Sequence, residues 1–458
     1  MVSMEHALVR TNNDRLLIAL AMAAAVACAF APAYALAAIA AVVSLAGIAA
    51  LLLNHRLAFL AFAFSIPFAT TQIIPVPGLS NLTFLMIALL GISLLVNIRR
   101  LPALSLRGLG LKPYLLLAFL LVSTASLLIA QNQEKALKFY AMAWIIFGLY
   151  LISAAMLRES SLKLKVANWF LAGTAASSVF ILYDFVTQPL ALAFYRAGKS
   201  FSGGINITIC FLIAIPLALA MLEGEKRLLV RAAYYAIALA SGAIILFSAT
   251  RSAWLALIIY LAYEAFKRPA RAIIATVIII VVVFGFMPIF MPFAFKASAL
   301  RAIAAFKPEY QPQQYIGFRV ENYSLAARMF AEHPLIGVGL GNFPEHAGAV
   351  GRSVIPVELM LDTHNTYLEI LTSGGLLGGL PYLLVWLITL LELAFVARKG
   401  SAVQRRFATG LGIGFLLLMI HGLFHNIYLV LLIAPMFAFA SALRRELTSP
   451  EANEARAG

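Results

Sequence analysis

Long uninterrupted apolar runs constrain the fold of this sequence more than any other feature. The run from Leu16 to Leu53 contains no charged residue, and neither does the run from Ala272 to Phe286. A transmembrane helix needs about 20 consecutive apolar residues, so such stretches predict segments that span a bilayer or lie within it. Charged residues make up only 12% of the chain, against about a quarter in a soluble domain. The sequence therefore predicts an all-α polytopic membrane protein.

Apolar blocks recur along the chain and predict about 12 to 14 transmembrane helices. Only one stretch of any size resembles a soluble segment, and it runs from Lys296 to Asn365. We therefore expect an N-terminal helix bundle over residues 1–295, one large loop over 296–365, and C-terminal transmembrane helices with a short tail over 366–458.

The basic residues indicate how the chain is oriented in the membrane. The formal net charge is +15, and Lys and Arg cluster in short loops near 99–112, 158–165, 226–231, 267–271 and 398–406. Basic residues in short loops mark the cytoplasmic side, and these loops alternate with less basic ones. The alternation predicts that both termini are cytoplasmic. Topology thus explains most of the net charge, and nucleic acid is not an expected partner.

Two longer loops on the predicted outer side carry charge that this rule does not explain. One runs from Asp184 to Ser202 and contains Arg196 and Lys199, and the other is the large loop. Within the large loop, Phe318 to Ala331 is typical of an amphipathic helix, with an apolar stripe of Val320, Tyr323, Ala327 and Phe330 that we expect at the membrane interface.

The end of that helix and the turn after it are also predicted by their residue types. His333 and Pro334 should end the helix, and the glycines at 337, 339 and 341 predict a flexible turn.

His364 is the strongest candidate for a catalytic residue. It lies in the sequence Asp-Thr-His-Asn-Thr-Tyr-Leu-Glu (362–369), at the predicted outer end of a long apolar helix. An imidazole suits proton abstraction near neutral pH, although a histidine here can also merely cap the helix. Asn365 and Tyr367, beside it, are candidate substrate-binding residues.

Several basic and polar residues on the same predicted face are candidates for binding an anionic substrate. Arg251 lies between two predicted spans on the outer side, where a charge is costly unless it has a function or reaches the lipid headgroups. Arg319 lies on the amphipathic helix and can equally be a solvated surface residue. The remaining candidates are Arg196, Lys199 and Asn206.

These cations suit phosphate oxygens because guanidinium groups bind them through paired hydrogen bonds. A lipid diphosphate fits a site that combines such cations with one base. His333, His346 and His364 lack the spacing of metal ligands, so the sequence predicts neither a metal site nor a cofactor.

The motif residues resemble those of the O-antigen ligase and polymerase superfamily. The resemblance lies in His364, Asn365, Gly375 and Gly378, together with the preceding segment His333-Pro334-Leu335 and its glycines up to Asn342 and Phe343. By motif it covers about Ser248 to Gly379, and elsewhere it rests on hydropathy alone.

The resemblance implies an O-antigen ligase, a glycosyltransferase of the Gram-negative inner membrane. It would transfer glycan from undecaprenyl diphosphate to the lipid A core oligosaccharide at the periplasmic face, without a metal or cofactor. By the same similarity, His364 would deprotonate the acceptor hydroxyl, and Arg251 and Arg319 would hold the donor diphosphate.

Alternatives within and outside the superfamily stay open at this point. A polymerase uses a second lipid-linked repeat as acceptor, and a protein O-oligosaccharyltransferase uses Ser or Thr. The single large loop directly before His364 favours the ligase. A lipid-linked oligosaccharide flippase is the alternative from another class, but the sequence has no evident internal repeat and its candidate residues gather at one face.

Overall fold

The computed structural model describes residues 35–69, 82–100, 109–187, 205–248, 250–290, 316–350 and 362–448, together with 296, 299 and 303. Within this part of the chain all regular structure is helical, which confirms the predicted all-α class. The chain forms two compact units. The first comprises residues 1–62 and 83–101, and the second comprises 63–82 and 102–458.

The smaller unit contains the first long helix that the structure describes and most of the next two. Helix α2 (Ala35–Leu53) is followed after Asn54 by α3 (His55–Ser65), and a bend of 115° separates the two. Helix α4 (Leu82–Val96) leads into the short helix η3 (Ile98–Arg100). The Ser93 hydroxyl of α4 donates to the Leu51 carbonyl of α2 at 2.7 Å, so a polar contact joins these apolar helices.

The larger unit holds most of the chain and all of the described site candidates. After the short η2 (Ile66–Phe68) its helices are α5 (Lys112–Leu127), α6 (Gln133–Met156), α7 (Ser160–Thr187), α9 (Ile205–Leu222), α10 (Leu228–Phe247), α11 (Arg251–Lys267), α12 (Pro269–Ile280), η5 (Val281–Phe286), α13 (Met287–Phe290), α15 (Ile316–Glu332), α16 (Phe343–Val350), α17 (Thr366–Lys399), α18 (Ala402–Gly422) and α19 (Ile433–Thr448).

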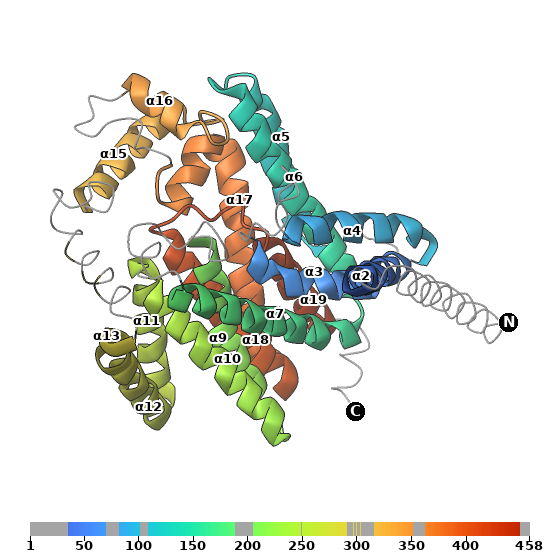
Figure 1. Ribbon diagram of the computed structural model, residues 1–458. Coiled ribbons are helices and arrows are strands. Elements are labelled where there is room, and N and C mark those ends of the chain that lie inside the picture. The colour runs from blue at the N-terminus through green and yellow to red at the C-terminus, as the bar shows by residue number, and fades with distance from the viewer. Residues whose placement is uncertain are drawn as a thin grey trace. The chain divides into compact units, whose positions relative to one another are not determined.

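Helix α17 lies in the middle of the larger unit, with α5, α18 and α19 packed along it (Figure 1). A buried ion pair helps to join three of these helices. The Lys112 ammonium of α5 lies 2.5 Å from the Glu392 carboxylate of α17 and donates to the Phe437 carbonyl of α19 at 2.7 Å. Arg444 of α19 contacts the same carboxylate at 3.2 Å. Charges that are buried this deeply need such partners.

Helix α17 is interrupted at Gly375, whose backbone has φ 59° and ψ −162°. The segment before α16 supplies the backbone partners that the interrupted helix lacks. Val338 and Gly339 donate to the carbonyls of Thr372 and Ser373 at 2.9 and 3.1 Å. In the other direction, Leu376 and Leu377 donate to the carbonyls of residues 334 and 335 at 2.8 and 3.0 Å. The paired segments satisfy backbone groups that apolar surroundings would otherwise leave unpaired.

The glycines of this region are needed for that close approach. A Cβ on Gly375 would lie 2.3 Å from the Leu335 carbonyl, and one on Gly337 would lie 2.4 Å from the Thr372 carbonyl oxygen. Gly337, Gly339 and Gly341 all have positive φ, a conformation that glycine adopts without strain. The predicted flexible turn is therefore held in place by specific backbone hydrogen bonds. We call residues 334–339 the docked segment.

Helix α15 confirms the helix expected over Phe318 to Ala331, and it ends at Glu332 as the following His333 and Pro334 predict. Its buried face consists of Phe318, Leu325, Ala326 and Met329, which pack with residues of α16 and the docked segment. The predicted apolar stripe is not this face, because Val320 is 59% exposed. Placement of that stripe at the membrane interface stays a prediction.

Five described helices are long and apolar enough to cross a membrane, or up to six if the bent pair near Asn54 is one span. They are 133–156, 160–182, 228–246, 366–399 and 402–422, and four shorter apolar helices accompany them. The chain is thus a multi-pass membrane protein. The larger number of about 12 to 14 spans also counts 16–32, which lies outside the described residues, so it stays a prediction.

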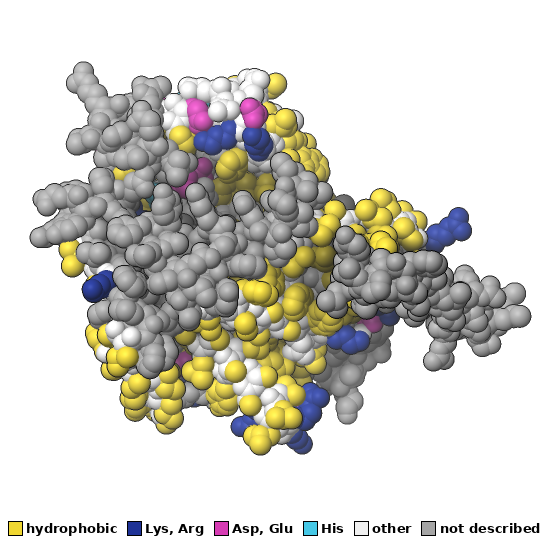
Figure 2. All heavy atoms as spheres, in the orientation of Figure 1, with side chains coloured by type: hydrophobic (Ala, Val, Ile, Leu, Met, Phe, Trp, Pro, Cys, Tyr) yellow, Lys and Arg dark blue, Asp and Glu magenta, His cyan; other side chains and the backbone are white. Residues whose placement is uncertain are grey.

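The surface fits a lipid environment. Hydrophobic side chains cover much of the described surface visible in Figure 2. Leu228 and Leu229 of α10 and Ile273 of α12 are among the large apolar residues that are exposed. Charged side chains gather near α16 and the turn between α5 and α6, where Lys135 lies 3.4 Å from Glu345. Large exposed apolar surfaces are typical of proteins that contact lipid.

Candidate functional site

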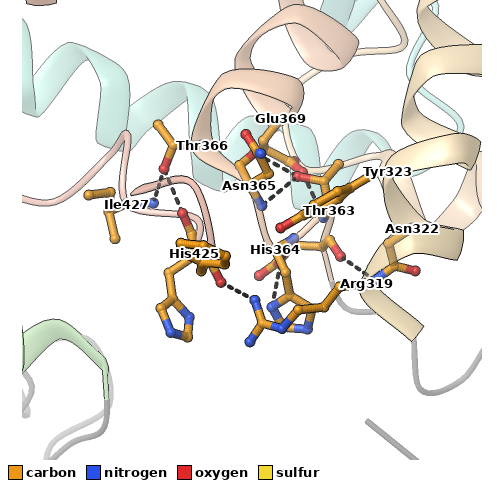
Figure 3. Close-up of polar contacts among 12 residues, drawn as sticks. Arg319, Asn322, Tyr323, Thr363, His364, Asn365, Thr366, Glu369, His425 and Ile427 are labelled. Atoms are coloured by element: carbon orange, nitrogen blue, oxygen red, sulfur yellow. Dashed lines mark hydrogen bonds and ion pairs between the residues drawn. The ribbon is translucent and has the colours of Figure 1, made fainter. Parts of the chain in front are cut away.

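The candidate site forms where the start of α17 meets helix α15 and the turn after α18 (Figure 3). The side chain of Asn365 caps α17 by accepting from the amides of Tyr367 and Leu368 at 2.9 and 3.1 Å. An asparagine is a favoured residue at this position because its carbonyl oxygen satisfies amides that the first turn leaves unpaired. The cap sets the direction in which the preceding residue, His364, is presented.

His364 has φ 53°, and it is the one non-glycine residue with positive φ in the described part of the chain. Asp362 holds this conformation from two sides. Its Oδ1 accepts from the His364 amide at 2.6 Å and lies 3.1 Å from the Nδ1 of the same residue. A non-glycine residue in this region costs roughly 1–3 kcal/mol, and such strain gathers at functional sites.

A buried carboxylate also holds this turn in place. Glu369 is 1% exposed, accepts from the Thr363 amide at 3.1 Å and lies 3.4 Å from the Ser373 hydroxyl. The Thr363 hydroxyl in turn donates to the Asn365 carbonyl at 2.8 Å. Residues 362–365 are therefore fixed by α17 itself.

Arg319 reaches the site from α15. Its guanidinium donates to the Phe424 carbonyl, and in Figure 3 it lies beside the His364 imidazole on the same side of the site. The ring of Phe318, the preceding residue, lies 5.9 Å from the His364 ring. A guanidinium has five donors, so one bond to a carbonyl leaves others to bind an anion.

Arg251 is the first residue of α11, and its neighbour Ser252 contacts the last turn of α18 through His421. The Thr250 side chain forms no capping hydrogen bond to this helix, and the first turn has no acidic residue. The amides in the first turn of a helix suit an anionic group, and Arg251 lies in this turn.

The other predicted binding residues fall into two groups. Asn365 and Tyr367 form hydrogen bonds within the protein. The Asn365 side-chain amide donates to the Leu423 carbonyl at 3.1 Å, and the Tyr367 hydroxyl donates to the Met419 carbonyl at 2.7 Å. Arg196 and Lys199 lie outside the described residues, and Asn206 lies in the first turn of α9 without a described side chain. Their contact with substrate stays a prediction.

Sequence reasoning missed Asp362, Glu369, Ser252 and His421 as site residues. The first two belong to the same motif as His364, and their positions two residues before it and five residues after it are a usable signal. Ser252 and His421 are 169 residues apart, and no local pattern indicates their contact. In the described part of the chain, no group of three or more His, Cys, Asp or Glu side chains could hold a metal ion.

The fold and the site together define a multi-pass helical membrane protein that gathers a histidine, a carboxylate and an arginine at one end of its interrupted central helix. A family model described as O-antigen ligase matches residues 236–383, which include Arg251, Arg319 and His364. This match confirms the resemblance to the O-antigen ligase and polymerase superfamily over that segment. No curated protein matches the chain.

Proposed function

We propose that this protein is an O-antigen ligase, which transfers glycan from undecaprenyl diphosphate to the lipid A core oligosaccharide. The pairing of His364 with Asp362 carries the proposal, because it gives the site a base of defined orientation beside Arg319, whose guanidinium suits a diphosphate. The family match supports glycosyl transfer of the ligase or polymerase type. The large loop directly before His364 favours the ligase.

In this proposal His364 is the general base. An Asp362 carboxylate that accepts from Nδ1–H favours the tautomer whose basic lone pair is on Nε2. Nε2 takes the proton of the acceptor hydroxyl as its oxygen attacks the anomeric carbon of the donor sugar. The bond from that carbon to the phosphate oxygen breaks, and its electron pair leaves on undecaprenyl diphosphate. A single in-line displacement of this kind inverts the anomeric configuration.

Arg251 and Arg319 stabilise the leaving group. The diphosphate gains negative charge as the glycosidic bond breaks, and fixed cations at that position lower the barrier. They replace the divalent metal that many diphosphate-dependent transferases use, so the reaction should need no metal or cofactor. Arg196, Lys199, Asn206, Asn365 and Tyr367 are proposed to contact the substrates around this centre.

The site is proposed to face the periplasm, in a protein of the inner membrane with both termini in the cytoplasm. Basic loops near 158–165 and 226–231 support this orientation, because basic residues in short loops mark the cytoplasmic side. Figure 2 shows basic side chains at the second of these loops, where α9 ends and α10 begins. Lipid-linked donor and lipid-anchored acceptor would then both reach the site by diffusion within the membrane.

The proposal is tested with purified protein, a lipid-diphosphate glycan donor and lipid A core acceptor, all in the presence of EDTA. Glycan-modified lipopolysaccharide is scored on a gel for the native chain, for His364→Ala and for Gly412→Ala. Gly412 is a matched control because an added Cβ would meet its nearest neighbour, Leu393, at an ordinary 3.5 Å. We expect product from the native chain and Gly412→Ala, and a loss of about 100-fold or more in His364→Ala.

Each alternative function predicts a different result in this assay. Elongation of the donor glycan without acceptor would replace the ligase by a polymerase, and transfer to Ser or Thr of an added peptide would indicate an oligosaccharyltransferase. Movement of donor across vesicles without any product would indicate a flippase. Full activity in His364→Ala would refute the assigned base.

A further inference from the structure

Three consecutive backbone carbonyls, those of Leu423, Phe424 and His425, accept hydrogen bonds from the residues that form the candidate site. We call them the carbonyl segment. Leu423 accepts from the Tyr323 hydroxyl at 2.8 Å and from Asn365 at 3.1 Å, and Phe424 accepts from Arg319. The segment thus sets the place of the α15 arginine relative to the start of α17.

Thr366 fixes the last carbonyl of this segment to α17. Its hydroxyl donates to the His425 carbonyl at 2.7 Å and accepts from the Ile427 amide at 2.9 Å (Figure 3). A Cβ on Gly422 would lie 3.3 Å from this hydroxyl, so the glycine allows the close approach.

Two buried histidines then join the carbonyl segment to α11. The rings of His421 and His425 lie 4.6 Å apart at an interplanar angle of 31°. His421 is fully buried, and its Nδ1 lies 3.0 Å from the Ser252 hydroxyl. Ser252 is itself 6% exposed and follows Arg251 directly.

The chemistry of this contact is unusual for a position that only fills space. The Nε2 of His421 is buried without a hydrogen-bond partner, and an unpaired buried nitrogen is unfavourable compared with an apolar side chain of similar size. The contact that the ring does make is to the turn that carries Arg251. Because both His421 and Ser252 are buried, they can act on a substrate only through their neighbours.

We propose that Ser252, His421 and His425 form a positioning unit, which holds the first turn of α11 so that Arg251 and Arg319 together bind the diphosphate of a lipid-linked donor. This inference rests on the proposed function and assigns the donor diphosphate, rather than the acceptor sugar, to the side of the site that these residues support. The unit touches no substrate and takes no proton from it.

The test compares Ser252→Ala, His421→Phe and the double variant with Ser177→Ala. Ser177 is a matched control because it is a buried serine whose hydroxyl bonds the Thr174 carbonyl of its own helix. Loss of the Ser252–His421 contact should raise the KM for the donor about tenfold and leave the KM for the acceptor unchanged. The double variant should match either single one, since all three remove the same contact.

Binding of inorganic pyrophosphate, measured by calorimetry on the purified full chain, gives a second readout that needs no turnover. We expect the Kd to rise about tenfold in Ser252→Ala and not in Ser177→Ala. The proposal is overturned if the native chain binds no pyrophosphate, if Ser252→Ala binds it as tightly as the native chain, or if both KM values rise together with a fall in Tm. Loss of ligase activity with intact pyrophosphate effects would instead refute the proposed function alone.

Discussion

Replacing Gly375 with alanine tests whether the docked segment holds the interruption of α17. At φ 59° and ψ −162°, an alanine costs about 1–3 kcal/mol in backbone strain alone. Its Cβ would also lie 2.3 Å from the Leu335 carbonyl carbon and oxygen, which are backbone atoms and cannot rotate away. The segment must therefore move, and the four backbone hydrogen bonds that join it to α17 are lost.

The expected size of the effect follows from these contacts. Each backbone hydrogen bond contributes about 0.5–1.5 kcal/mol net, so the lost bonds and the strain together amount to about 3–9 kcal/mol. If α17 closes into a continuous helix it regains bonds of its own, and the loss falls toward the lower value. A fall in Tm of about 5 °C or more is expected.

The assay combines Tm in detergent with hydrogen exchange of the Val338 and Gly339 amides, which donate to α17 in the native protein. Both amides should exchange faster in Gly375→Ala, and ligase activity should fall because residues 362–365 directly precede the part of α17 that ends at Gly375. Gly412→Ala is the control, since its added methyl makes ordinary contact only. Equal Tm and equal exchange in the two variants would refute the reasoning.

Three further changes test other contacts. Asp362→Asn should lower kcat about 10- to 1000-fold with little change in Tm, because the amide no longer stabilises the charged ring of His364, and an unchanged kcat in the transfer assay would argue against the pairing. Lys112→Met should lower stability by about 3 kcal/mol because it removes the nearest cation from buried Glu392, whereas the double variant Lys112→Met/Glu392→Gln should regain most of the loss in denaturant melts. Thr366→Val removes a hydroxyl that bonds two backbone groups and should lower Tm, with Thr366→Ser as the control that keeps both bonds.

The helices of this fold could be predicted from local sequence because each apolar block carries its own signal. The block around Ser252 to Phe266 became α11 within one residue at either end, and Phe318 to Ala331 became α15. The face of α15 that packs on the protein could not be predicted. Its outer stripe is as apolar as its buried face, so periodicity does not say which one contacts protein and which one contacts another environment.

The site was predictable only as far as it is local. The segment from Asp362 to Glu369 holds both the candidate base and the carboxylates that fix it, so the motif contained the information. Contacts between distant segments could not be predicted from the sequence. The hydrogen bond from Arg319 to the Phe424 carbonyl is an example. The glycines before α16 were recognised as a turn, but their docking depends on an interruption of α17 that lies beyond them in the chain.

The pairing of the docked segment with α17 also bears on how the chain is made and how it can be dissected. Synthesis produces residues 334–339 before 372–377, so the backbone partners for the interrupted helix are already present when that helix emerges. A fusion or truncation placed before Leu377 would separate the two and leave polar backbone groups of both without partners. Topology reporters should therefore be joined after this helix, where the protein upstream of the junction keeps its own contacts.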